Sequence, residues 1–423
     1  MRGIKNMKRR RKNNRVNILI LIIIIVLLIS LCLFIYIKYK KYNDDKYNIN
    51  DIEEHYGETV KVNSDATIYT LVNGQYIEKG KVYENTILNL GKQSDNNNQY
   101  FLITNFNNDY YIYYKYVNPT NDKITKNERY KKYIPFNENI TGENLKLYKD
   151  NNLVLSLYEK VSLPIYIKEY NKYYVDYADD LYEIKKDNVS IEKVINTNEQ
   201  NISKIGVLNY HFFWDDEEEN INDCNQVICH SKTQFKTHLD YIRENNILTL
   251  QMNELEKWID GKIQLPKSVV ITIDDGWKAE LGIKMLNEYQ MYGTLFLITS
   301  QYDPKYYENK YVELHSHTDN LHVGGKCPGG QGGGIKCLPH DEVLNDLTTS
   351  REKLNGSTVL CYPFYEFNDY SIKLAKEAGF TMAFAGESSF KDNHVKQTSE
   401  KYSLPRFVVV TYTSMNDFAN FVG

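Results

Sequence analysis

The chain has 423 residues, which is more than one compact domain usually contains, so two or three folded units are expected. Its 51 basic and 55 acidic side chains leave a formal net charge of -4. This balance gives no global basic field of the kind that nucleic-acid-binding proteins use to neutralise phosphates. Nucleic acid is therefore not an expected partner.

The first forty residues combine a basic tail with a long apolar run. The run from Ile18 to Ile37 consists almost entirely of Ile, Leu, Val and Phe, and about 20 residues at 1.5 Å each cover the roughly 30 Å hydrocarbon core of a bilayer. The larger number of basic side chains precedes the run. This pattern predicts a cytoplasmic tail over 1–17, a single transmembrane anchor over 18–37, and an extracellular remainder. A cleaved signal peptide is the alternative, although the run is long for one and no small-residue cleavage site follows it.

Residues 43–203 show the short alternating runs and turn residues of β-structure. The run from Thr67 to Val72 is followed by the turn pair Asn73-Gly74, and tyrosine-rich segments recur at 109–114 and 172–177. The region resembles tandem bacterial SH3-like domains, which often bind cell-wall glycan or peptide. A plain β-rich spacer is the alternative.

From residue 204 to the C-terminus, apolar strands alternate with amphipathic helices. Strands are predicted at 205–209, 269–273, 294–298, 358–362 and 407–411, and helices at 233–244, 252–259, 279–289, 340–354 and 370–378. This alternation predicts an α/β domain with a parallel sheet, open or closed into a barrel, whose site lies at the C-terminal strand ends.

Two carboxylates follow the apolar run from Val269 to Ile273, and Gly276 permits a turn directly after them. Neighbouring residues of a strand face opposite sides, so Asp274 and Asp275 do not suit the glycosidase arrangement of two carboxylates about 5 to 9.5 Å apart. A metal ligand beside a general base is the better interpretation, and a solvated turn is the alternative.

Three of the nine histidines, His315, His317 and His322, fall within eight residues. Imidazole and carboxylate are the ligands of an open catalytic site for a borderline divalent metal. One aspartate with two histidines would leave positions for water and substrate. The two clusters together predict a metal centre.

These motifs resemble those of the polysaccharide deacetylase domain, also called the NodB homology domain or carbohydrate esterase family 4, from about residue 206 onwards. The run T-I-D-D-G at 272–276 is similar to the family's T-F-D-D-G. The resemblance implies a distorted (β/α) barrel of the NodB type, with Asp274 as general base and Asp275 as metal ligand.

The histidines match the second motif of the family, which implies His317 and His322 as the other two metal ligands. Their spacing of five resembles the branch that deacetylates poly-β-1,6-N-acetylglucosamine. His315 stays outside the ligand set because the family usually has a non-ligand there. Zinc suits these ligands, and cobalt or nickel would too.

The third motif of the family is recognisable in Tyr362-Pro363-Phe364, which implies the backbone N–H of Phe364 as a donor to the oxyanion. The arginines that usually precede the proline are missing. Arg406 is a candidate for their charge from the next strand, and an ordinary surface arginine is the alternative. The family's general-acid histidine has no clear counterpart, with His394 as the remaining candidate.

The six cysteines are too few for a disulfide scaffold. The pairs Cys224 with Cys229 and Cys327 with Cys337 each bracket a short loop, so local disulfides are an open alternative. The second loop is rich in glycine and directly follows the histidines. A flexible lid or groove wall is one interpretation of it, and a disordered insertion is the other.

The resemblance implies a hydrolase that removes N-acetyl groups from N-acetylglucosamine residues of a cell-surface polysaccharide, either poly-β-1,6-N-acetylglucosamine or peptidoglycan. In this mechanism a bound metal lowers the pKa of water and polarises the acetyl carbonyl, and the general base accepts the proton. A catalytically weak or inactive glycan-binding protein, held at the membrane by its anchor, is the alternative. Protein partners are not indicated by the sequence.

Overall fold

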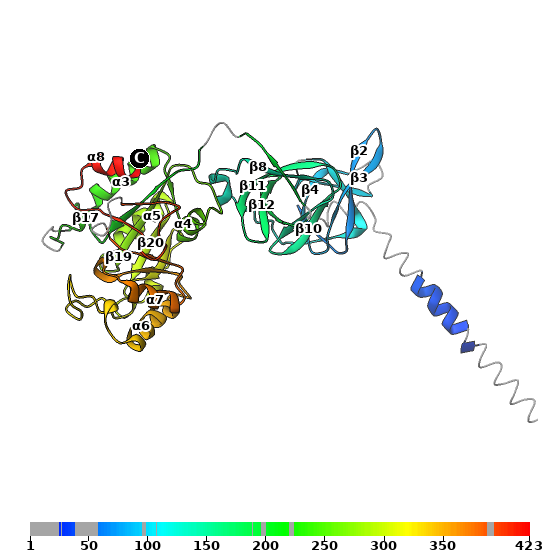
Figure 1. Cartoon of the computed structure of the whole chain (residues 1–423). Coiled ribbons are helices and arrows are strands. Elements are labelled where there is room, and N and C mark those ends of the chain that lie inside the picture. The colour runs from blue at the N-terminus through cyan, green and yellow to red at the C-terminus, as the bar shows by residue number, and fades with distance from the viewer. Residues whose placement is uncertain are drawn as a thin grey trace, which may run out of the picture. The chain divides into compact units, whose positions relative to one another are not determined.

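The computed structural model describes residues 25–26, 28–38, 58–94, 99–106, 108–187, 189–195, 200–219, 224–386 and 393–423. They form two compact units (Figure 1). One unit comprises the described residues up to Thr125 together with Glu143–Lys160, and the other comprises Lys126–Gly142 together with Val161–Gly423.

The predicted membrane anchor over 18–37 is not supported. Within the residues that the structure describes, no helix is both long and apolar enough to cross a membrane. The described residues of this run and its edge, 25–26 and 28–38, are helical. Residues 1–24 and 27 lie outside the described residues. The prediction of a single-pass protein with an extracellular catalytic domain is therefore wrong on the described structure.

The first unit is built from antiparallel strands. They are β1 (Thr59–Val62), β2 (Ala66–Val72), β3 (Gln75–Val82), β4 (Ile87–Ser94), β5 (Tyr100–Ile103), β6 (Tyr110–Tyr113), β7 (Val117–Pro119), β9 (Leu145–Lys149) and β10 (Asn152–Leu157), with the 3-10 turn η1 (Tyr114–Tyr116). Their order is β9-β10-β3-β2-β6-β5-β4-β1-β7. In β6, Tyr110 and Ile112 are buried while Tyr111 and Tyr113 are partly exposed, which is the alternation of a one-sided sheet. The region is β-rich as predicted, and its SH3-like nature stays a prediction.

The second unit begins with further β-structure. Its elements are η2 (Arg129–Lys132), β8 (Glu138–Gly142), β11 (Val161–Lys168), β12 (Lys172–Tyr177), β13 (Asp180–Lys185) and β14 (Ser190–Lys193), and the strands are ordered β14-β8-β11-β12-β13. Arg129 binds both carboxylate oxygens of Glu254 at 2.6 Å, and Tyr133 donates to the same carboxylate at 2.7 Å. Because Glu254 is buried, this paired arginine fastens the β-structure to the following α/β part. The predicted domain boundary at 203/204 stays a prediction.

The α/β part contains a mostly parallel sheet. Its strands are β15 (Ile205–Tyr210), β18 (Leu248–Thr249), β19 (Ser268–Asp275), β20 (Gly293–Leu297), β21 (Val312–Ser316), β22 (Val359–Cys361), β23 (Met382–Phe384), β24 (His394–Val395) and β25 (Phe407–Val408). The order is β23-β22-β21-β20-β19-β15-β24, with β18 paired to β19 and β25 paired to β15. All of these pairings are parallel except that of β24 with β15. The predicted α/β class is confirmed.

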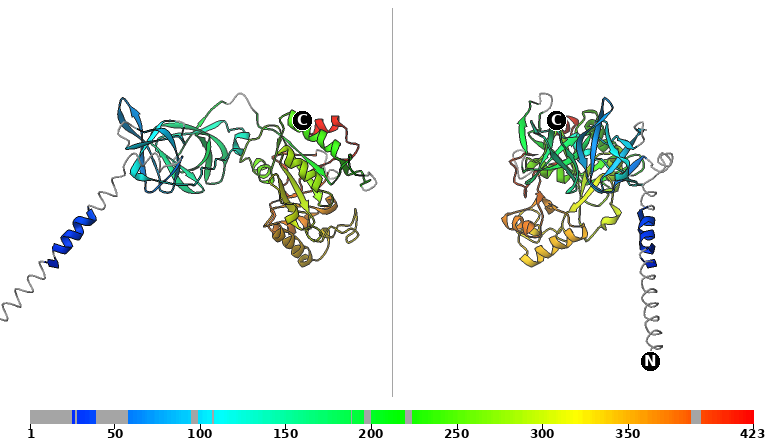
Figure 2. Two further views of the ribbon diagram at one scale, coloured as in Figure 1. Left: turned by 180° about the vertical axis from the view of Figure 1, so that it is seen from behind. Right: turned by 90° about the vertical axis from the view of Figure 1, so that its right-hand side faces the viewer.

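Helices follow the strands and cover the sheet. They are α3 (Lys232–Glu244), α4 (Met252–Ile259), α5 (Glu280–Tyr289), α6 (His340–Lys353), α7 (Asp369–Glu377) and α8 (Met415–Val422), and the short elements are β16 (Phe212–Trp214), β17 (Cys229–Ser231), η4 (Pro304–Tyr306), η5 (Gly334–Lys336) and η6 (Pro363–Tyr365). Helices α6 and α7 pack against each other (Figure 2).

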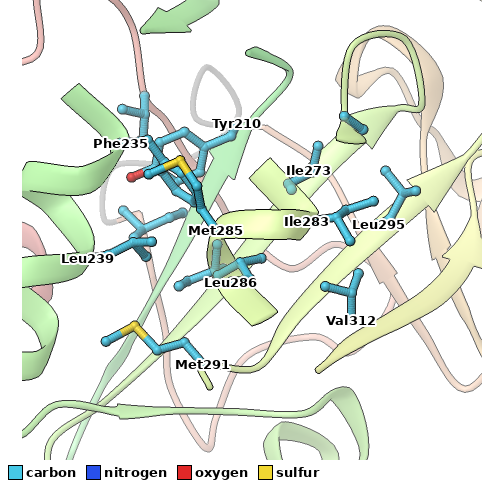
Figure 3. Packing of buried hydrophobic residues seen from close by; sticks show 14 of the residues in the cluster. Tyr210, Phe235, Leu239, Ile273, Ile283, Met285, Leu286, Met291, Leu295 and Val312 are labelled. Atoms are coloured by element: carbon cyan, nitrogen blue, oxygen red, sulfur yellow. The ribbon is translucent and has the colours of Figure 1, made fainter. Parts of the chain in front are cut away.

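The core lies between these helices and the sheet. In α5, Ile283 and Leu286 are one turn apart and buried on the same face. They lie in one cluster with Ile273 of β19 and Leu295 of β20 (Figure 3). This packing fixes β19 in the middle of the sheet, so its C-terminal end presents the site residues from a rigid support.

Candidate active site

The turn after β19 separates the two aspartates. Asp274 is the last fully buried residue of the strand and is 1% exposed, whereas Asp275 is only partly buried. Asp275 has a φ of +73° and Gly276 a φ of +114°. A Cβ atom on Gly276 would lie 2.7 Å from a methyl group of Leu297, so the turn needs glycine for space as well as for its backbone. The positive φ of Asp275 stores strain where the chain leaves the sheet.

Asp274 is held by Arg406 in a fully buried ion pair. The Nη1 and Nη2 atoms of Arg406 donate to the two carboxylate oxygens at 2.7 and 2.8 Å, and Arg406 is 0% exposed. Burial alone would raise the pKa of Asp274, but the charge of Arg406, followed by that of His317, holds the pKa below its ordinary value. The carboxylate is therefore ionised. Arg406 is therefore not the ordinary surface arginine that the sequence offered as an alternative.

The remaining donors of Arg406 are also occupied. Its Nε donates to the carbonyl of Ala385 at 3.1 Å, and Nη1 also contacts Thr272 Oγ1 at 3.2 Å. Nη2 lies 3.0 Å from the sulfur of Cys361, which stands before the third motif where the family usually has arginine. Strand β15 pairs with β19 on one side and with β25 on the other. Arg406 directly precedes β25, and from there its side chain reaches Asp274 of β19.

Asp275, His317 and His322 come together on the other side of the turn. Oδ1 of Asp275 lies 3.3 Å from Nε2 of His317 and 3.4 Å from Nε2 of His322. Burial, followed by the charge of His317, lowers the pKa of His322 to about 4. His322 is thus a neutral imidazole at neutral pH, which is the form that ligates metals.

The loop that carries the two histidines is held from outside the site. His317 donates through Nδ1 to the carbonyl of Cys361 at 2.9 Å, and this bond orients the ring so that Nε2 faces Asp275. Asp346 of α6 accepts from the backbone N–H groups of Asp319 and Asn320 at 2.8 and 2.7 Å. Thr318, a β-branched residue, has a φ of +71°, so the loop keeps a strained shape because its surroundings impose it.

These residues fit a divalent metal. Two ligand atoms about 2.0 to 2.1 Å from a tetrahedral zinc would lie about 3.3 to 3.4 Å apart, which is the spacing found here. The ligand atoms of all three residues lie within 4.8 Å of one another, and buried Oδ1 of Asp275 has no hydrogen-bond partner among the described residues. A second grouping, Asp274 with His317 and Cys361, fits less well because Arg406 already occupies both oxygens of Asp274.

Phe364 lies at the start of η6, next to His322. Its φ is +57°, and its ring centroid is 4.5 Å from that of His322. Because η6 begins at Pro363, the N–H of Phe364 belongs to the first turn, where N–H groups have no partner within the helix. This arrangement suits the predicted oxyanion donor.

His211 is a site residue to which the sequence assigned no role. It is 8% exposed, and its Nε2 lies 3.2 Å from the hydroxyl of Tyr365. That hydroxyl donates its only proton to Asn209 at 2.9 Å, so Nε2 of His211 is the donor, and Nδ1 has no partner among the described residues. Burial lowers the pKa of His211 below its ordinary value, and the negative charges of Asp274 and Asp275 partly oppose this shift. The signal that could have identified His211 from the sequence is its position directly after β15, in Leu208-Asn209-Tyr210-His211.

The other histidines considered from the sequence lie away from this cluster. His394 pairs with Gly206 at the N-terminal end of β15, and its Nε2 donates to the carbonyl of Phe421 at 2.9 Å. His211 follows the C-terminal end of the same strand, so His394 is at the opposite end from the site. His315 contacts Ser357 at 2.8 Å rather than Asp275.

The glycine-rich loop is ordered rather than a disordered insertion. A disulfide joins Cys327 to Cys337, as another joins Cys224 to Cys229. Glu366 accepts from the N–H groups of Gln331 and Gly333 and pairs with Lys336 at 2.8 Å.

Two glycines of this loop lie close to neighbouring side chains. A Cβ atom on Gly330 would overlap the Glu366 carboxylate at 1.8 Å, and one on Gly333 would lie 3.4 Å from the ring of Phe364. The loop therefore forms a wall beside Phe364, as one of the two interpretations of the sequence expected.

Comparison with known proteins finds a similarity to polysaccharide deacetylases. The model of the polysaccharide deacetylase family matches residues 262–383. The Bacillus subtilis (strain 168) protein named "Putative polysaccharide deacetylase YxkH" is 24% identical over 174 residues, which cover 37% of this chain and 58% of that protein. The chain thus spans little more than half the length of this curated relative.

Two solved structures are among those that resemble the chain. A de-N-acetylase from Aggregatibacter actinomycetemcomitans has a TM-score of 0.44 and 21% identity, covering 52% of this chain and 99% of that one. IcaB from Ammonifex degensii has a TM-score of 0.44 and 18% identity, covering 53% and 99%.

Proposed function

We propose that the protein is a metal-dependent hydrolase that removes acetyl groups from N-acetylglucosamine residues of a polysaccharide, and the match of residues 262–383 to the polysaccharide deacetylase family supports this proposal. The observation that carries the proposal is that the two aspartates at the end of β19 have different partners. Asp274 is ionised and closed off by Arg406, while Asp275 shares the spacing of a metal site with His317 and His322. The NodB-type barrel belongs to this proposal as the expected fold of the domain.

A divalent metal held by Asp275, His317 and His322, with zinc as our first choice and cobalt or nickel as others, would supply Lewis-acid activation of water and of the acetamide carbonyl. The residues of the chain do the rest. Asp274 accepts a proton from the attacking water. Arg406 orients the Asp274 carboxylate and keeps it ionised. The N–H of Phe364 donates to the oxygen that becomes negatively charged.

His211 is proposed as the group that protonates the leaving amine. Its Nε2 bears the proton shared with Tyr365, so Nδ1, which has no partner among the described residues, holds a lone pair that can take up a proton and pass it to the amine. Breaking the amide C–N bond then gives acetate and a free amine on the sugar. In a His211→Gln variant we expect kcat to fall roughly 100 to 10,000-fold, with an unchanged metal content. Wild-type kcat in that variant would remove His211 from the mechanism.

The observations also bear on the alternative of an inactive glycan-binding protein. That alternative rested on the missing arginine of the third motif and the missing acid. The contact of Arg406 with Asp274 and that of His211 with Tyr365 make these two residues candidates for the two functions, which supports the hydrolase.

Within the hydrolase proposal, poly-β-1,6-N-acetylglucosamine is the preferred substrate over β-1,4-linked peptidoglycan. Support comes from the five-residue spacing of His317 and His322 and from the lack of arginine before Pro363, both of which resemble that branch. Since specificity is a difference in transition-state binding, one changed wall contact shifts preference by roughly 10 to 200-fold.

The decisive experiment measures acetate released by the full chain from β-1,6 and β-1,4 N-acetylglucosamine oligomers and from peptidoglycan. Each assay is run with added metal and after chelation. Metal-dependent release is expected, with the β-1,6 oligomer fastest. Release that survives complete chelation would contradict the metal mechanism, and no release from any of the three would contradict the hydrolase.

A further inference from the structure

Trp277 is an exposed indole on the turn that leads out of the site. It follows the metal-site residue Asp275 by two positions and is 39% exposed. Trp258, in contrast, is fully buried. Folding does not require a large aromatic side chain to be exposed to solvent at this position, and exposed apolar surface often marks a binding site.

A row of rings connects this indole with the buried site. The ring centroid of His211 lies 6.4 Å from that of Tyr365 and 5.8 Å from that of Phe212. Phe212 in turn contacts Trp277 edge-on, with centroids 4.7 Å apart. The indole thus packs at the outer end of a row of aromatic rings whose inner end is at the proposed proton donor.

The turn that carries Trp277 is fixed on both sides. The carbonyl of Gly276 accepts from the hydroxyl of Tyr307 at 3.1 Å, and the carbonyl of Lys278 accepts from the N–H of Phe213 at 3.1 Å. Lys278 also forms an ion pair with Glu219 at 3.0 Å. A rigidly held ring loses little conformational freedom when a ligand stacks on it, so binding is less opposed by entropy.

We propose that Trp277 is a stacking platform for a sugar ring of the polymer that neighbours the residue being deacetylated. This inference rests on the proposed function of the site. The C–H groups on one face of a pyranose ring present an apolar surface, and an indole is the largest flat apolar side chain available to receive it. Val323, which follows the metal-site residue His322, is also exposed at 43% and adds a second apolar side chain next to the site residues in sequence.

The competing role for Trp277 is structural. Its contact with Phe212 covers the small cluster that Phe212 forms with Cys224 and Cys229. A purely structural role predicts that removing the indole lowers stability and affects every substrate equally. A platform predicts an effect that grows with the length of the sugar chain.

The test compares full-chain Trp277→Ala, Trp277→Phe and the control Tyr170→Ala, which removes a 95% exposed aromatic ring from the turn between β11 and β12. Acetate release is measured on mono- and penta-N-acetylglucosamine and on an aryl acetate that has no sugar ring. Binding is measured separately by retardation in gels that contain poly-N-acetylglucosamine. For Trp277→Ala we expect KM for the pentamer to rise roughly 10-fold or more, weakened retardation, and aryl acetate hydrolysis within about twofold of wild type. Trp277→Phe should be intermediate, and Tyr170→Ala should match wild type.

Two results would overturn the platform. One is wild-type retardation and wild-type KM for the pentamer in Trp277→Ala. The other is an equal loss on the pentamer and on the aryl acetate, which would assign the indole a structural role. Retardation that depends on Trp277, in a protein that releases no acetate, would support the platform and contradict the proposed hydrolase function. A failure of the platform can therefore be distinguished from a failure of the proposed function.

Discussion

The two aspartates at the end of β19 belong to regions of opposite character. The closed region contains Asp274, Arg406 and Cys361, all of them buried, and both oxygens of its carboxylate accept hydrogen bonds from arginine. The open region contains Asp275, His317 and His322, where a carboxylate oxygen faces two imidazole nitrogens and no donor completes it among the described residues. One peptide bond separates a carboxylate that is paired with arginine from one that faces two imidazole rings.

This difference explains how neighbouring identical side chains can have different functions. Successive residues of a strand point to opposite sides, and the positive φ of Asp275 turns it further away from Asp274. A base must keep a lone pair for the proton of water, whereas a ligand gives its lone pairs to the metal. The closed and open regions therefore respond differently to the same substitution.

The largest effect is expected from the open region. A His317→Ala, His322→Ala double variant of the full chain should lose the bound metal and with it essentially all acetate release, because two of three ligand atoms are removed. Metal is measured by mass spectrometry of the purified protein. The matched control is His340→Ala, since His340 is partly exposed on α6 and pairs with Asp341 and Glu377. Equal metal occupancy in the double variant and the wild type would refute the assignment.

Asp274→Asn tests the closed region and should separate metal binding from catalysis. The amide keeps the size of the side chain but cannot accept the proton, so acetate release should fall roughly 100 to 10,000-fold. Metal content should remain that of the wild type. Loss of metal in Asp274→Asn would instead make this aspartate a ligand, and the distinction between the two regions would fail.

The open region was more predictable from the sequence than the closed one. Asp275, His317 and His322 lie within two short motifs at the ends of successive strands, and parallel strands bring such ends to one edge. Arg406 lies far along the chain from Asp274 and reaches it only because the two-residue strand β25 pairs with β15. No local pattern encodes that pairing, so Arg406 was a candidate with a surface alternative.

The shortest strands, and the contacts between segments distant in the sequence, were also the least predictable parts of the fold. The long strands and amphipathic helices of the α/β part are found within a few residues of their predicted bounds, as for α4 at Met252–Ile259. The brief parallel pair of β16 and β17 has too few residues for a periodic signal. For the apolar run at 18–37, hydropathy alone predicted a membrane span, and no helix among the described residues is long and apolar enough to make one.

Arg406→Met should destabilise the closed region without affecting the ligands of the open one. Removing one partner of a buried ion pair leaves an uncompensated charge, which typically costs about 3 to 5 kcal/mol. The free energy of unfolding is measured by chemical denaturation. Arg243→Met is the control, because Arg243 pairs with Asp240 while its own side chain is 60% exposed, and such surface pairs contribute about 0 to 1 kcal/mol. A similar loss in both variants would show that the buried pair is not special.

The smallest effect is expected at the wall beside the open region, from Glu366→Ala. Glu366 holds the glycine-rich loop through the N–H groups of Gln331 and Gly333 and through Lys336. Its loss should reduce stability by about 1 to 3 kcal/mol, as expected for hydrogen bonds to a charged group.

In Glu366→Ala, amide hydrogen exchange should speed up over residues 327–337, while the metal content stays that of the wild type. Because Gly333 approaches the ring of Phe364, a loosened wall should raise KM for polymer more than it lowers kcat. Glu352→Ala, at an exposed position of α6, is the control and should change none of these quantities. Unchanged hydrogen exchange in Glu366→Ala would mean that the disulfide between Cys327 and Cys337 suffices to hold the wall, and the role given to Glu366 would be refuted.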